Sequence, residues 1–144
     1  MRNTFVMRKL TTIVALAWMM VGSTALVQAE DTPLAKEMSS MNDAFKALSK
    51  ETDPVKGAAL AREAAEATLK GISLTPDFIQ DMIPDPKEKA KAVADYRKMM
   101  AQAFIVFCDI ETAFIDGKMD DVAKLVKDAK ALKKEGHNKY IEEE

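Results

Sequence analysis

Residues 119–140 decide the fold, and they read MDDVAKLVKDAKALKKEGHNKY. Val122, Val126 and Ala129 recur at spacings of four and three, which is typical of one apolar face of an amphipathic helix. His137 is the only histidine of the chain, and it lies three helical turns after Val126 and therefore on the same face. The stretch predicts a helix that carries this histidine inward near its carboxyl end.

Three further helices are expected upstream, because a capping residue followed by proline occurs three times. The starts are Asp31-Thr32-Pro33, Asp53-Pro54 and Asp85-Pro86. An Asp or Thr side chain can accept a hydrogen bond from the free amides of a first turn, and proline at the first helical position loses no hydrogen bond there. Gly71 and Gly117 are expected to end the second and third helices.

Each of these helices has apolar residues at spacings of three and four, which predict one inward face. The inward residues are Leu34, Met38, Met41, Phe45 and Leu48 in the first helix, Val55, Ala58, Ala65 and Leu69 in the second, and Tyr96, Met100, Ala103, Phe107, Ile110 and Phe114 in the third. Residues 72–84 form one long apolar connection, in which Pro76 and Pro84 are expected to prevent a helix and which is expected to cover the core. The pattern predicts an all-α, up-down-up-down antiparallel four-helix bundle.

Residues 1–29 have the organisation of a cleavable signal peptide. A basic segment precedes a mostly apolar run from Leu10 to Val21, and small residues end at Ala29. The run is shorter than the roughly 20 residues that a membrane span needs, so stable membrane insertion is not expected. We expect export to the periplasm and a single mature domain of residues 30–144.

Composition excludes several classes of function. Three Lys or Arg and no Asp or Glu lie in residues 1–29, so their removal changes the net charge from −2 to −5. An acidic chain is a poor candidate for nucleic-acid binding. Cys108 is the only cysteine outside the signal segment and is expected to be a buried, inert thiol. One His and one Cys offer no catalytic constellation, and a di-iron site would need two Glu-x-x-His motifs, so we expect no enzyme.

The predicted topology brings Met38 and His137 to the same end of the bundle. Met38 lies about one turn into the first helix, and His137 lies about one turn before the end of the last. Taken by itself, an inward methionine is usually a residue of the hydrophobic core, and a histidine near a helix end is usually exposed to solvent. Together, a thioether and an imidazole facing one cavity form an established axial ligand pair for haem iron.

The same residues carry a resemblance to a known family. The segment 38–43, MSSMND, resembles the amino-terminal pattern of the cytochrome b562 family, which has a ligand Met, two residues, an apolar residue and Asn-Asp. Residues 117–140 are similar, without a gap, to that family's last helix, whose ligand His stands in a His-Gln-Lys-Tyr-type ending. Tyr96 and Met100 stand where the family has two Phe residues that face the haem. The resemblance covers essentially all of residues 30–144.

The resemblance implies a soluble periplasmic electron carrier with one non-covalent haem b. It implies Met38 and His137 as axial ligands of the iron, and haem and unidentified periplasmic redox proteins as partners. The haem pocket would include Leu34, Met41, Phe45, Tyr96, Met100 and Lys133. Covalent attachment through Cys-x-x-Cys-His is excluded, because Lys133 and Gly136 occupy the two cysteine positions.

Two positions depart from the family's pattern. Lys133 replaces an Arg near the haem propionates, which keeps the charge but loses the planar fork. Gly136 costs roughly 1 kcal/mol inside a helix, and it either makes room for a ring or ends the helix early. These departures favour an alternative, a haem-free exported bundle that acts as a binding or adaptor module. Soft-metal binding through Met38, Met41 and His137 is a further alternative, since thioethers favour cuprous copper.

Overall fold

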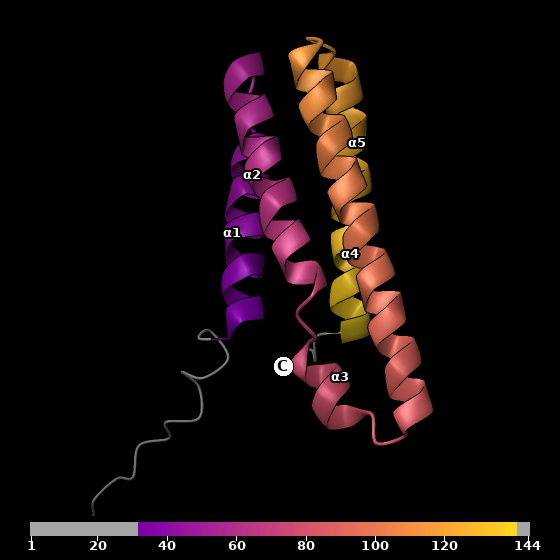
Figure 1. Ribbon diagram of the computed structural model, residues 1–144. Helices are drawn as coiled ribbons and strands as arrows, with labels where there is room; N and C mark the ends of the chain where they lie inside the picture. Colours follow the sequence, from indigo (N-terminus) through magenta and orange to yellow (C-terminus); the bar gives the residue numbers. More distant parts are fainter. Residues whose placement is uncertain (1–31, 141–144) are drawn as a thin grey trace, which may run out of the picture.

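The computed structural model describes residues 32–140, which form five helices and no strand. The predicted signal peptide and residues 141–144 lie outside the described residues. The helices are α1 (Pro33–Leu48), α2 (Pro54–Ile72), the short α3 (Asp77–Met82), α4 (Pro86–Ile115) and α5 (Met119–Tyr140). The four long helices run alternately up and down along a common direction (Figure 1), as expected for an antiparallel four-helix bundle.

The three proline starts begin helices at the predicted positions. Thr32, Asp53 and Asp85 each accept a hydrogen bond from the amide three residues ahead, at 3.1, 2.9 and 2.8 Å respectively. Each bond satisfies an amide that has no partner within its own helix. The local sequence therefore fixes where α1, α2 and α4 begin.

The turn from α4 to α5 is fixed by Gly117, as predicted. Its φ of 68° lies in the left-handed region, which glycine adopts without the steric cost of a Cβ. The amides of Gly117 and Lys118 donate to the carbonyls of Phe114 and Ala113 at 3.0 and 2.9 Å. This pair of bonds is a Schellman motif, which satisfies two free carbonyls at the end of the helix.

Predictions about the face and the end of α2 were wrong. Val55 and Leu69 are 79% and 53% exposed, because small residues rather than large ones form the buried face of this helix. That face consists of Gly57, Ala58, Ala61, Ala64, Ala65, Ala67, Thr68 and Gly71. Gly71 does not end the helix either, since α2 continues to Ile72 and its C-cap is Ser73. The small side chains allow close packing of α2 against α1 and α4.

The connection between α2 and α4 is also more ordered than expected. Pro76 and Pro84 do not prevent a helix; they lie on either side of α3, and Pro76 is its N-cap. Ile79 of α3 is fully buried and packs in a cluster with Tyr96 and Met100 of α4. The prediction that this connection covers one end of the core is therefore confirmed.

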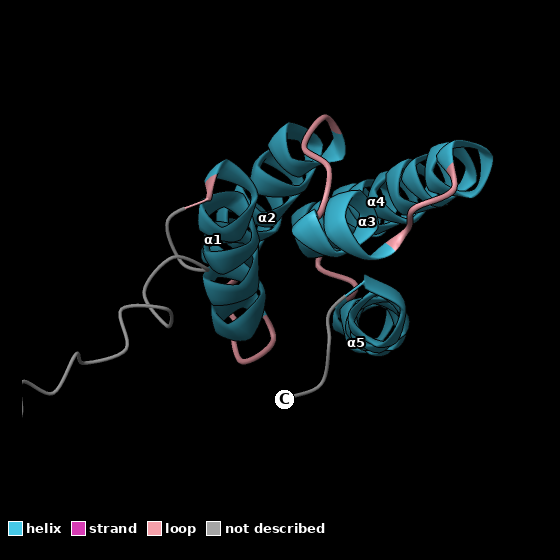
Figure 2. Cartoon of the chain, turned by 90° about the horizontal axis from the view of Figure 1, so that it is seen from below, coloured by secondary structure: helices cyan, strands magenta, loops and turns pink. Residues whose placement is uncertain are grey.

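The long helices do not pack evenly around the bundle. α1 packs against α2, α2 against α4, and α4 against α5, whereas α1 and α5 make no comparably extensive approach. Viewed from below, α1 and α5 are well separated (Figure 2). Within residues 32–140, no helix is long and apolar enough to cross a membrane.

Candidate functional site

A cavity of about 1020 Å³ lies between α1, α4 and α5. Most of its lining residues belong to the part of the bundle where α1 begins and α5 ends, which is the lower end of the ribbon in Figure 1. Its volume is at the upper end of the roughly 300–1000 Å³ that is usual for small-molecule and cofactor sites. The residues singled out from the sequence all line this one cavity: Leu34, Met38, Met41, Phe45, Tyr96, Met100, Lys133 and His137. The structure thus brings together residues that lie up to about a hundred positions apart in the chain.

The backbone of α2 lies behind the wall that Met38 and Met100 form, at Gly71, which has no side chain and does not itself line the cavity. A Cβ atom on Gly71 would lie 2.8 Å from the Cε atoms of both Met38 and Met100. Two methionines from different helices therefore converge on the surface that this glycine leaves open. The hydroxyl of Tyr96 donates to the Gly71 carbonyl at 3.0 Å, and burial raises the pKa of Tyr96 to about 12. The protonated phenol holds this wall in place.

His137 lies on the last turns of α5. It lines the cavity but is exposed at its opening, whereas an inward position was expected. The helix continues through Gly136 to Tyr140, so of the two alternatives for Gly136 the early end of the helix is wrong. Partial burial of the ring lowers the pKa of His137, and the nearby Lys133 lowers it further. Both effects favour the neutral imidazole, which is the form that ligates a metal.

The end of α5 is attached to α4 by a polar contact. The Tyr140 hydroxyl donates to Asp95 Oδ2, and Lys139 Nζ lies 3.3 Å from the same carboxylate. The hydrogen bond from Tyr140 is the main cause of a lowered pKa at Asp95. The Tyr140 ring also meets Tyr96 edge to face, with centroids 5.7 Å apart. These contacts hold the helix one turn beyond His137.

Lys133 joins the two helices that the cavity separates. Its Nζ donates to Asn42 Oδ1 at 2.5 Å, and Asn42 belongs to the Asn-Asp pair of α1. This is a charge-assisted hydrogen bond between α5 and α1. The predicted propionate neighbour therefore does line the cavity, and its ammonium group already has a neutral side-chain partner there.

Sequence reasoning left several lining residues out of the pocket, among them Met99 and Leu132. Met99 is 8% exposed, and it follows Tyr96 by three positions. Leu132 follows the buried Ala129 by three. A search for spacings of three beside the main stripe would have found both, because a core-facing helical stripe is wider than one line of residues.

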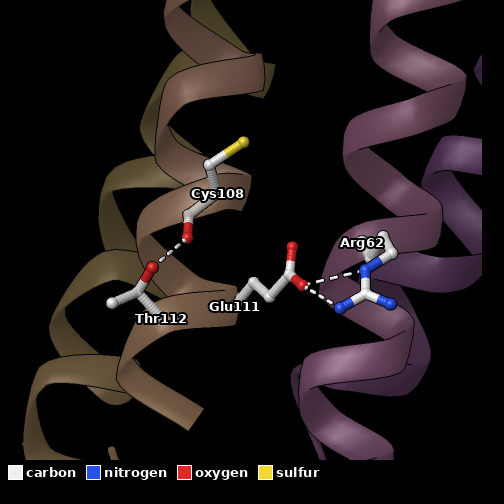
Figure 3. A network of polar contacts seen from close by, with 4 residues as sticks. All are labelled: Arg62, Cys108, Glu111 and Thr112. Carbon is white, nitrogen blue, oxygen red and sulfur yellow. Dashed lines mark hydrogen bonds and ion pairs between the residues drawn. The ribbon is translucent and has the colours of Figure 1, made fainter. Parts of the chain in front are cut away.

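Residues 32–140 contain no cluster of three or more His, Cys, Asp or Glu that could hold a metal ion. Cys108 lies outside the cavity and is half-buried, rather than buried as expected. Burial, then Glu111 and Asp109, raise the pKa of its thiol, so the unreactive protonated form dominates. Its carbonyl accepts a hydrogen bond from Thr112, and Glu111 pairs with Arg62 of α2 (Figure 3).

The fold and the cavity together define a four-helix bundle with one internal site of cofactor size. A family model described as cytochrome b562 matches residues 33–140. The chain belongs to the cytochrome b562 family, and membership implies a haem-binding electron-transfer protein with a b-type haem. A comparison with curated proteins gave no match.

Proposed function

We propose that this protein is a periplasmic electron carrier that holds one haem b non-covalently, with Met38 and His137 as axial ligands. The observation that carries this proposal is a convergence. Residues chosen for ligand chemistry and spacing, on three separate helices, line one cofactor-sized cavity in a member of the cytochrome b562 family.

The lining fits a haem in shape and chemistry. Leu34, Phe45 and Met100 offer an apolar surface for the porphyrin faces, and α1 and α5 each supply one ligand atom type, a thioether and an imidazole. Lys133 can exchange its bond to Asn42 for a propionate, since a carboxylate is a stronger acceptor for an ammonium group than a neutral amide. The depressed pKa of His137 keeps the imidazole neutral for binding.

The bound haem supplies a one-electron exchange between ferric and ferrous iron. Met38 and His137 would fill both axial positions, so the protein offers no open position for oxygen or a substrate, and Met/His ligation favours a raised reduction potential. The apolar residues of the lining would shield the faces of a bound haem from water. These features suit electron transfer rather than catalysis.

The test is titration of the purified mature protein with hemin, read by absorption before and after dithionite reduction. Saturation at one hemin per chain, with the sharp reduced bands of a six-coordinate b-type haem, is expected. Met38→Ala and His137→Ala should each lose the low-spin spectrum, whereas Met82→Ala, at an exposed position outside the cavity, should keep it. Unchanged spectra in both ligand variants would refute the ligand assignment.

A haem-free binding module is the second candidate, because Lys133, the expected propionate neighbour, is hydrogen-bonded to Asn42 of α1. It predicts a colourless protein with no saturable hemin uptake. Copper binding by Met38, Met41 and His137, which all line the cavity, predicts one-to-one cuprous uptake that hemin does not displace. Export is tested separately, by amino-terminal sequencing of the periplasmic protein, with cleavage expected after Ala29.

A further inference from the structure

A second hollow, here called the lysine groove, lies beside the haem cavity and between the same two helices. It has a volume of about 580 Å³ and is lined by residues of α1 and α5 and of the turn that follows α1. Five of its nine lining residues are lysines, and none is Asp or Glu. The lysines are Lys46, Lys50, Lys130, Lys133 and Lys134. Apart from Phe45, Lys133 and His137, none of its lining residues belongs to the haem cavity.

These lysines form two rows, one from α1 and the turn that follows it and one from α5. Lys46 lies near the end of α1, and Lys50 lies in the turn after the helix. Lys130 and Lys134 are four positions apart on α5, a spacing that places both on one helical face. All four residues are exposed. The ammonium groups therefore border the groove from both sides, where each row raises the positive potential felt by the other.

Little negative charge from the protein itself compensates this surface. Among residues 32–140, the only carboxylate within 4 Å of the five lysines is that of Asp43, which is 3.9 Å from Lys46. Lys133 is bonded to the neutral Asn42. The whole chain nevertheless carries more acidic than basic residues, 23 against 21. Positive charge is thus concentrated at this groove on an otherwise acidic protein.

The groove adjoins the site where an electron would leave. It shares Phe45, Lys133 and His137 with the haem cavity. A molecule that rests in the groove therefore contacts the exposed histidine side of the cofactor site. Position and charge together mark this face for a negatively charged partner in electron exchange.

We propose that the lysine groove is the docking surface for the acidic face of a protein redox partner. This inference rests on the proposed electron-carrier function. Lysine presents a hydrated point charge on a flexible stem rather than a rigid fork, so several lysines on two helices suit a face with several carboxylates. Such charge complementarity speeds encounter, and electron-transfer complexes have small, transient interfaces.

Docking is tested first on the haem-free protein, by ¹⁵N NMR titration with hexaglutamate at low ionic strength. Saturable shifts are expected within residues 46–50 and 130–138. The variant Lys50→Gln/Lys130→Gln/Lys134→Gln should lose them. A matched control, Lys56→Gln/Lys70→Gln/Lys87→Gln, removes the same charge from exposed lysines outside both hollows and should keep them.

Electron transfer is tested on the haem-loaded protein, by stopped-flow oxidation with hexacyanoferrate(III). One electron leaves the reduced protein and converts the probe into hexacyanoferrate(II). Electrostatic steering changes association rates by roughly 10–10³-fold, so the groove variant should react about tenfold more slowly at low salt. The control variant should react at nearly the original rate, and the difference should vanish at high salt.

Four results would overturn the proposal. Shifts of equal size in both triple variants would show a net-charge effect without a docking surface. The same shifts with inorganic phosphate alone would identify a small-anion site. Tighter binding to phosphatidylglycerol vesicles than to hexaglutamate would assign the groove to a membrane surface. Groove shifts in a chain that takes up no hemin would refute the electron-carrier function, and with it the redox character of the partner.

Discussion

The two ends of this bundle are built on opposite principles. At the closed end, where α1 turns into α2 and α4 into α5, the side chains of Leu48, Ile110 and Phe114 are fully buried among small residues of α2. At the open end, α1 and α5 stand apart around a cavity of about 1020 Å³, and the buried cluster reduces to Ile79, Tyr96 and Met100. The closed end holds the fold together, and this allows the open end to keep unfilled space.

That division has an energetic reason. A cavity lined by apolar side chains lacks the contacts that a packed core gains, so the open end contributes less to the free energy of unfolding. A ligand that fills the space recovers those contacts only in the folded state, which stabilises it by mass action. Substitutions at the closed end should therefore cost more stability than comparable substitutions at the open end.

Phe114→Ala removes a fully buried ring at the closed end and should destabilise the haem-free protein by about 3–5 kcal/mol. Met100→Ala, whose side chain borders the cavity, should cost only about 2 kcal/mol, because less packed volume is lost. Urea unfolding followed by circular dichroism measures both. Equal costs would mean that the two ends are equally well packed.

Gly57→Ala tests how closely α2 approaches α4 at the closed end. A Cβ on Gly57 would overlap the Phe114 ring, and this ring is fully buried and has no room to move. Overpacking of this kind costs typically 1–3 kcal/mol, and we expect about 2 kcal/mol in the same urea experiment. A neutral result would show that the closed end is more adaptable than its burial indicates.

Gly71→Ala makes the same change at the open end. Its Cβ would come too close only to the terminal methyl groups of Met38 and Met100, which can move into the cavity, and it would meet Leu34 Cδ1 at an ordinary 3.7 Å. We expect a net loss of about 1 kcal/mol, since strain is partly offset by better helix propensity. The sharper readout is the absorption of the hemin-loaded variant, because a displaced Met38 weakens the sixth ligand. An unchanged spectrum would remove Gly71 from any role in positioning Met38.

Gly136→Ala is the matched control for the Gly57→Ala and Gly71→Ala variants. A Cβ there meets nothing closer than Met99 Cε at 3.8 Å, an ordinary contact. The variant should therefore gain roughly 0.5–1 kcal/mol from lower unfolded-state entropy and better helix propensity. Destabilisation would instead show that the helix at His137 depends on this glycine for a reason other than space.

The smallest effect concerns protons at the opening of the cavity. The pKa of His137 in the haem-free folded chain lies below its usual 6.5, so below pH 6.5 the unfolded chain binds more protons. The contribution of His137 to stability is then lost as pH falls through that range. Lys133→Gln should raise the pKa of His137 toward 6.5, as measured by NMR titration. A fall in this pKa would show that the charge of Lys133 does not lower it.

Local signals in the sequence predicted the starts of the helices well, but the buried face of α2 was predicted badly. The reason is physical. Asp-Pro starts and Gly117 act through neighbouring backbone atoms, so they are readable without tertiary structure. The buried face of α2 depends on which helices approach it. Alanines occur on several faces of this helix, so hydrophobicity alone does not identify the buried face. Val55 and Leu69 were placed inward by their hydrophobicity, although the small residues around Ala61 and Thr68 decide the packing.

The candidate site was predictable where one face of a helix determines it. Met38, Tyr96 and Met100 could be placed at one end from register and topology alone. The role of Gly71 could not, because it depends on two side chains from other helices meeting one bare backbone position. The bond between Lys133 and Asn42 spans 91 positions in the chain, and no spacing rule within one helix reveals it.

The uneven packing of the helices also affects how fast a cofactor can enter the protein. α1 is packed on α2, and α5 on α4, so the molecule consists of two hairpins joined along α2 and α4. A cofactor can enter between α1 and α5 by a small opening of these hairpins about that seam, after release of Lys133 from Asn42. Uptake would then proceed on the timescale of a hinge motion and be independent of global unfolding, because neither hairpin has to come apart.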